Sequence, residues 1–196
     1  MNRQNKRQWL VRQSIAFSER KLAKDKNYFM KMDKGRTPEL LWIGCADSRV
    51  DPAHILDSKP GELFVIRNVA NQALPDDSSF QAVLEYSVLH LKVKGIVVCG
   101  HSNCGGINAT ASVYHKLESN LQRALRTLRS DFLALRALNP GKSMEQLQHM
   151  MYYQNVRNQV SNLMRVSFVR EAVESNQTEI LPMLFRLDTG RLEEVV

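Results

Sequence analysis

Apolar residues recur along this chain at two spacings. Short, β-branched apolar runs, typical of the buried strands of a parallel sheet, alternate with stretches in which apolar residues recur at helical spacing. Strands are predicted at residues 39–45, 62–67, 95–100, 180–187 and 191–196. Helices are predicted at residues 9–32, 53–56, 80–93, 121–135 and 144–174, with another starting after Gly106. The alternation predicts an α/β fold, with a central, mostly parallel sheet of four to five strands flanked by helices.

The N-terminal part differs from the rest in its charge. Residues 1–36 hold 11 of the 27 lysines and arginines but only 3 of the 20 acidic residues, so the net charge of +7 belongs to this part. Gly35 and Pro38 end its helix. We therefore expect a basic helical arm at residues 1–36 and a single α/β domain at residues 37–196.

The charge and the apolar pattern also limit the partners. A basic arm can bind nucleic acid, but a solvated helix face is the commoner reason for such a charge, so nucleic acid is disfavoured as a partner. No run reaches the roughly 18 apolar residues of a membrane span, and the N-terminus lacks an apolar signal-peptide region. We therefore expect a cytoplasmic protein without a membrane partner.

Chemically reactive residues follow two of the predicted strands. Cys45 and Asp47 follow the first strand, and His101 and Cys104 follow the third. The carboxyl ends of parallel strands are where open α/β sheets hold their sites, so we expect these side chains to lie together. Two thiolates, one imidazole and one carboxylate suit a tetrahedral zinc ion. Cys99 lies inside an apolar run and is expected to be a small buried hydrophobe.

The pattern Cys-x-Asp-x-Arg at residues 45–49, with His-x-x-Cys at residues 101–104, resembles that of the β-class carbonic anhydrases. The resemblance is close over roughly residues 40–108 and includes Pro-Gly-Glu at 60–62 and Arg-Asn-Val-Ala-Asn at 67–71. It implies a zinc lyase that reversibly hydrates CO2 to bicarbonate and a proton through zinc-bound hydroxide. It also implies that the N-terminal helix packs across a neighbouring subunit in a homodimer or tetramer.

The resemblance assigns roles to the residues of the first motif. Cys45, His101 and Cys104 are the implied zinc ligands. Asp47 has two possible roles: it accepts a hydrogen bond from the zinc-bound hydroxide, or it occupies the fourth zinc position and closes the site. Arg49 can form a bidentate pair with the Asp47 carboxylate and hold it off the metal. Asp47 and Arg49 are thus candidate catalytic residues that form an open/closed switch.

The resemblance also implies a substrate pocket and a regulatory site. Three residues are expected to line the CO2 pocket, some of them from the neighbouring subunit: Leu63, Tyr86 and Gly105. Leu63 and Tyr86 are also residue types that ordinarily lie in a protein core. One branch of the family inhibits itself with bicarbonate held by a tryptophan, an arginine and a tyrosine. Trp42 and Arg67 match the first two, whereas Phe185 stands at the tyrosine position and has no hydroxyl to donate.

Two other functions stay open. A related hydrolase acting on a CO2-like molecule, such as carbonyl sulfide or carbon disulfide, would share the metal site. A non-catalytic protein with a structural zinc ion would use the basic arm to bind nucleic acid. The remaining histidines have no ligand-like spacing: they are His54, His90, His115 and His149. A redox role is not supported, because the chain has no Cys-x-x-Cys pair.

Overall fold

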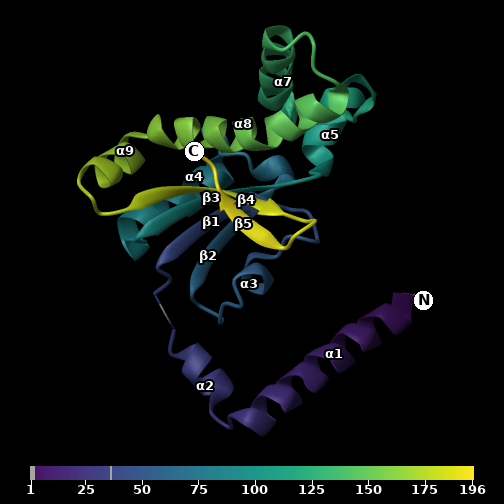
Figure 1. Cartoon of the computed structure of the whole chain (residues 1–196). Helices are drawn as coiled ribbons and strands as arrows, with labels where there is room; N and C mark the ends of the chain where they lie inside the picture. Colours follow the sequence, from purple (N-terminus) through teal and green to yellow (C-terminus); the bar gives the residue numbers. More distant parts are fainter. Residues whose placement is uncertain (1–2, 36) are drawn as a thin grey trace. The chain divides into compact units, whose positions relative to one another are not determined.

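A five-stranded sheet forms the centre of Pro38–Val196, one of the two units into which this computed structural model divides (Figure 1). The structure describes residues 3–35 and 37–196. The strands lie in the order β2-β1-β3-β4-β5, and only β5 is antiparallel to its neighbour. Their bounds are β1 (Leu40–Cys45), β2 (Leu63–Asn68), β3 (Gly95–His101), β4 (Glu179–Arg186) and β5 (Arg191–Glu194). The predicted α/β fold is confirmed, and each strand end lies within two residues of its expected place.

Helices flank this sheet (Figure 1). The long helix α8 crosses one face of the sheet, where it packs on β3 and β4 and is contacted by α5, α7 and α9. The helices are α3 (Pro52–Ile55), α4 (Ser78–Glu85), α5 (Gly105–Ser112), α6 (Ser119–Ala124), α7 (Arg126–Leu138), α8 (Met144–Met164) and α9 (Ser167–Glu174), with the short 3-10 turns η1 (Val69–Asn71) and η3 (Tyr114–Lys116). Strand β3 is buried along its whole length, so its apolar run reflects cover on both faces.

Local signals in the sequence explain where several helices begin. The Asp51 carboxylate accepts a hydrogen bond from the backbone N–H of His54, and Pro52 occupies the first helical position of α3. Asp77 caps α4 in the same way. Helix α8 starts with a reciprocal capping box between Ser143 and Gln146.

Three predicted helices of this unit are each interrupted in the structure. The helix expected at residues 80–93 becomes the π-helical segment η2 (Tyr86–Leu91) after α4. The one expected at 121–135 breaks at Leu125, and the one expected at 144–174 breaks at Arg165–Val166. Apolar periodicity continues across each break because both halves pack on the same core, so the pattern does not reveal the change of direction.

The unit Met1–Thr37 contains two helices where one was predicted at residues 9–32: α1 (Arg3–Lys24) and α2 (Tyr28–Asp33). The Asp25 carboxylate breaks the helix by accepting hydrogen bonds from the Asn27 backbone N–H and the Lys31 ammonium. Large apolar side chains of α1 are exposed, among them Trp9, Leu10, Val11 and Ile15. Among the described helices of the whole chain, none has the length and apolar composition needed to cross a membrane.

Candidate metal centre and active site

Three reactive side chains meet at the carboxyl edge of the sheet. Cys45 ends β1, His101 ends the adjacent parallel strand β3, and Cys104 stands directly before α5. Their sulfur and nitrogen atoms all lie within 4.8 Å of one another, and the two sulfurs are 3.9 Å apart. All three residues are at most 5% exposed. The structure therefore brings together three of the four candidate ligands, and Asp47 is not part of this group.

The ring of His101 is oriented by a backbone carbonyl. Its Nδ1 lies 3.0 Å from the Ser102 carbonyl oxygen, which can only accept, so Nδ1 carries the proton. The other ring nitrogen, Nε2, is then a lone-pair donor, and it is buried without a hydrogen-bond partner among the described residues. A buried, unsatisfied nitrogen beside two sulfurs fits a metal ligand whose second nitrogen is fixed by the protein.

The contact between the two sulfurs shifts the pKa values of the two thiols in opposite directions. A hydrogen bond from Cys104 lowers the pKa of Cys45, and the backbone N–H groups of Asp47 and Ala70 lower it further. The Cys45 thiolate and burial raise the pKa of Cys104. Two sulfurs bound to a tetrahedral zinc ion at about 2.3 Å are about 3.8 Å apart, so the residues fit zinc, which would bind both sulfurs as thiolates.

Asp47 and Arg49 form a bidentate ion pair beside these ligands. Arg49 Nε donates to Asp47 Oδ1 at 2.9 Å and Nη2 to Oδ2 at 2.7 Å, while the Arg49 backbone N–H also donates to Oδ1. These donors hold the pKa of Asp47 far below its usual range. Asp47 Oδ2 lies 4.0 Å from His101 Nε2. The structure thus shows the paired arrangement, one of the two predicted, and the roles themselves stay predictions.

Arg67 holds the loop that follows β1. Its Nε donates to the Cys45 carbonyl oxygen at 2.7 Å, and its Nη2 donates to the Asp47 carbonyl oxygen at 2.5 Å. A third nitrogen lies 3.8 Å from the Asp51 carboxylate. Most of this guanidinium is therefore engaged by the chain itself.

The other two residues of the expected bicarbonate site lie in the core. The indole of Trp42 covers Gly44, where a β carbon would be 2.5 Å from Nε1. Through the strand pairing, Trp42 lies opposite Leu181 of β4. Phe185 is four residues further along β4, where it pairs with His101. The bicarbonate site stays a prediction that these contacts do not favour.

One of the three expected pocket residues lies at the metal centre of the same chain. Gly105 follows Cys104, and the space around its Cα is open. Leu63 pairs with Leu40 at the opposite end of the sheet from Cys45. Tyr86 is half exposed, stacks on His90 and contacts Phe64 at a tilted angle. A pocket role for Leu63 and Tyr86 would require a second copy of the chain and stays a prediction.

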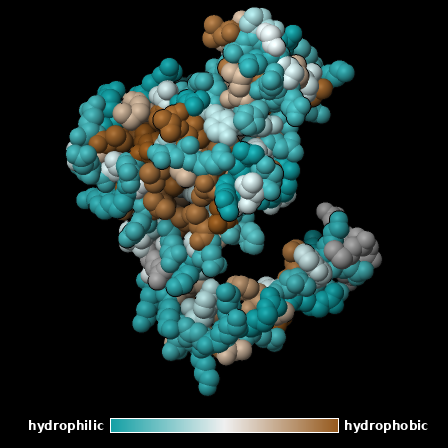
Figure 2. Space-filling view, in the orientation of Figure 1, coloured by the Kyte–Doolittle hydropathy of each residue, from teal (hydrophilic) through white to brown (hydrophobic). Residues whose placement is uncertain are grey.

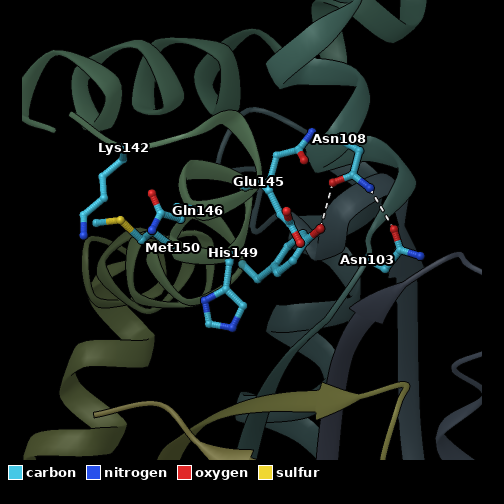
Figure 3. A pocket seen from close by; sticks show the side chains of 9 residues that line it. Asn103, Asn108, Lys142, Glu145, Gln146, His149 and Met150 are labelled. Atoms are coloured by element: carbon cyan, nitrogen blue, oxygen red, sulfur yellow. Dashed lines mark hydrogen bonds between the residues drawn. The ribbon is translucent and has the colours of Figure 1, made fainter. Parts of the chain in front are cut away.

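A cavity of about 720 Å³ lies between the first turns of α8 and the segment around Asn103 (Figure 3). In its wall the Tyr152 hydroxyl donates to Asn108 Oδ1, and Asn108 Nδ2 donates to Asn103 Oδ1. The Asn103 carbonyl oxygen accepts from Arg49 at 3.2 Å. A chain of hydrogen bonds therefore connects α8 to the ion pair.

Sequence reasoning missed a group of buried amides beside the metal centre. Gln72, Asn155 and Gln159 are each at most 2% exposed and bond to one another. The signal was present: Asn155 and Gln159 are four residues apart, on the helix face that also carries Val156 and Leu163. Amide side chains on a buried apolar face require hydrogen-bond partners, so this spacing indicates a buried polar group.

Known proteins resemble this chain in sequence and in fold. The family model for carbonic anhydrase matches residues 40–192. A carbonic anhydrase of Emericella nidulans is 33% identical over an alignment of 177 residues, which covers 87% of this chain and 75% of that protein.

Among solved structures, a tetrameric β-carbonic anhydrase of Sordaria macrospora has a TM-score of 0.85 at 33% identity, covering 97% of both chains. The β-carbonic anhydrase CafA of Aspergillus fumigatus has a TM-score of 0.84 at 30% identity, covering 96% of this chain and 90% of that one.

The α/β fold and its Cys-His-Cys group define a candidate metalloenzyme of the lyase class. The chain belongs to the β-class of the carbonic anhydrase family.

Proposed function

We propose that this enzyme catalyses the reversible hydration of CO2 to bicarbonate and a proton, with Cys45, His101 and Cys104 as the ligands of a zinc ion. The observation that carries this proposal is the buried, unsatisfied Nε2 of His101 beside two sulfurs 3.9 Å apart. A zinc ion held there would supply a hydroxide nucleophile at neutral pH, because it lowers the pKa of a bound water to about 7.

In this proposal Asp47 orients the nucleophile. Its pKa is held low by Arg49, so it remains a carboxylate that accepts a hydrogen bond and does not store the proton. The two-pronged contact with Arg49 fixes both carboxylate oxygens. An O–H group bound by Asp47 has its lone pair free to attack the carbon of CO2.

We also propose that the working form is a homo-oligomer, at least a dimer. The Sordaria macrospora relatives are tetrameric. β2 lies at the edge of the sheet, and apolar side chains are exposed on and near it: Val65, Val69, Tyr86 and Leu89. Figure 2 shows hydrophobic surface gathered on one face of the main unit. A second copy covering this edge would complete the CO2 pocket with Leu63 and Tyr86, and the exposed apolar side chains of α1 fit an arm that packs on a partner.

A cytoplasmic location is part of the same proposal. The Cys45 and Cys104 sulfurs bind a metal only while they are reduced, and the cytoplasm keeps thiols reduced. CO2 and bicarbonate are the proposed small-molecule partners.

Stopped-flow CO2 hydration with a pH indicator tests the proposed reaction. We expect the zinc-loaded, assembled protein to accelerate hydration at alkaline pH, and the absence of acceleration in such a sample would overturn the proposal. Turnover of carbonyl sulfide and carbon disulfide in parallel addresses the alternative hydrolase. Neither this alternative nor the nucleic-acid-binding protein is favoured, since the relatives described above are carbonic anhydrases.

A further inference from the structure

The chain turns sharply directly after β2, next to the candidate metal centre. Ala70 has φ 64° and ψ 33°, and Asn71 has φ 46°, a left-handed region that side chains with a β carbon rarely adopt. Both residues are completely buried. Two consecutive left-handed residues persist only where the surrounding structure holds them.

Three buried amide side chains hold this turn, and we call Gln72, Asn155 and Gln159 the amide clamp. The Ala70 carbonyl oxygen accepts from Gln72 Nε2 at 2.7 Å and from Asn155 Nδ2 at 3.0 Å. Asn155 Oδ1 accepts from both glutamines at 2.9 Å. Gln159 Oε1 accepts from the Ala73 backbone N–H at 2.9 Å. The clamp thus connects helix α8 to the segment that carries the turn.

The turn contacts both cysteine-bearing segments. Asn68, which precedes the turn, pairs with Cys45 across the parallel strands β1 and β2. On its other side, a β carbon at Gly106 would lie 3.2 Å from the Ala70 side chain and 2.9 Å from that of Val69. Gly106 therefore permits α5, whose N-cap is Cys104, to approach the turn closely.

We propose that the amide clamp is a set of positioning residues for the metal centre. It holds the backbone of Ala70 in its left-handed conformation, so that the turn keeps the end of β2 paired with Cys45 and packs closely against Gly106, next to the Cys104 segment. This inference rests on the proposed function, because it takes Cys45 and Cys104 as metal ligands. Partners of metal ligands typically contribute about 10- to 100-fold in metal affinity, and we expect the clamp to act in this range.

Cobalt(II) titration of the full chain, followed by thiolate-to-cobalt charge-transfer absorption and by competition with a chelator, tests the clamp without an activity assay. Asn155→Leu replaces the amide by an apolar side chain of similar size. We expect about 10- to 100-fold weaker cobalt binding and a shifted absorption band. The matched control is Asn158→Leu, since Asn158 lies on the same helix but bonds Asp131 and Gln154; its cobalt affinity should equal that of the wild type.

A second substitution separates positioning from mere packing. Glycine adopts positive φ without the cost of a β carbon, so Ala70→Gly in the Asn155→Leu background should restore cobalt affinity toward the wild type. Wild-type affinity in Asn155→Leu, an equal loss in Asn158→Leu, or no recovery in the double variant would each overturn the proposal.

If Asn155→Leu does not fold, Asn155→Asp takes its place, because it keeps the size and the acceptor but loses the donor to the Ala70 carbonyl. Weaker binding that Ala70→Gly restores supports the clamp, and unchanged binding overturns it. A wild-type protein without any thiolate–cobalt band overturns the proposed zinc centre itself, which distinguishes the two failures.

Discussion

The three candidate metal ligands and the Asp47–Arg49 pair are neighbours, but the protein holds them in different ways. The ligands are buried at two strand ends and a helix start, and His101 is oriented by a backbone carbonyl. The side chains of Asp47 and Arg49 are 18% and 48% exposed, and they hold each other. In the proposed mechanism, metal binding therefore depends on the fold, whereas orientation of the nucleophile depends on one side-chain pair.

The chain contains a useful reference for this pair. Arg186 and Asp188 form a bidentate pair of the same kind, also two residues apart, with contacts of 3.0 and 2.7 Å. This second pair bridges the turn between β4 and β5, and neither residue belongs to the metal-ligand group. Bidentate geometry alone therefore does not mark a functional pair, and comparing the two shows what the metal centre adds.

The largest effect on activity should come from substitution of a candidate metal ligand. In Cys104→Ser, the hydroxyl is not deprotonated at neutral pH and replaces a soft thiolate, so zinc should be lost and CO2 hydration should fall to the buffer background. Zinc content per chain and stopped-flow hydration measure both. Cys99→Ala is the control, because burial raises the pKa of Cys99 to about 12 and its sulfur lies outside the ligand group. One zinc ion per chain retained by Cys104→Ser would contradict the assignment.

The next effect should come from the ion pair. Asp47→Ala should lower kcat by about 10²- to 10³-fold while the zinc content stays at one per chain, since the substitution removes the proposed acceptor that orients the nucleophile but none of the three clustered ligands. Asp188→Ala, in the reference pair, should leave kcat unchanged. If Asp47→Ala lost zinc together with activity, the two regions would not be separable in the way described.

Arg67 connects the two regions, and its loss should have an intermediate effect. Arg67→Gln removes the donors to the Cys45 and Asp47 carbonyl oxygens, so we expect about a 10-fold fall in kcat with a small loss of zinc affinity. Arg67→Lys should recover little, because an ammonium cannot reproduce the planar fork that spans both oxygens. Full activity in both variants would show that the loop after β1 holds its shape without Arg67.

The smallest effect should come from the hydrogen-bond chain behind the ion pair. Tyr152→Phe removes the hydroxyl that donates to Asn108, at a cost of about 1 kcal/mol in the free energy of unfolding. Arg49 keeps its two bonds to Asp47, so kcat should change by less than about 2-fold. Urea unfolding and stopped-flow hydration test this, and a loss as large as that of Asp47→Ala would place Tyr152 in the catalytic machinery.

Much of the fold and the ligand set could be predicted from the sequence because both depend on short, contiguous stretches of residues. Strands β1 and β3 are uninterrupted apolar runs, and Cys45 and His101 stand where these two runs end. Parallel pairing of β1 with β3 then brings the two residues together. The rule that sites of open α/β sheets lie at the carboxyl ends of the strands is enough for this step, since the rule requires no knowledge of side-chain conformations.

The remaining features depend on long-range partners that a local pattern does not contain. Nothing near Ala70 in the sequence indicates a left-handed residue, because the groups that hold it include Asn155, which lies 85 residues further along. The break at Leu125 is hidden by a continuing apolar period. Leu63 and Tyr86 lie away from Cys45 in one chain, so their predicted role depends on an intermolecular arrangement.

Zinc K-edge X-ray absorption of the purified protein at alkaline pH tests the central claim most directly, because it reports the atoms around the metal. The account predicts two sulfur atoms at about 2.3 Å, one imidazole nitrogen at about 2.0 Å and one further light atom. A zinc ion with fewer than two sulfur neighbours, in a natively folded and reduced sample, would contradict it.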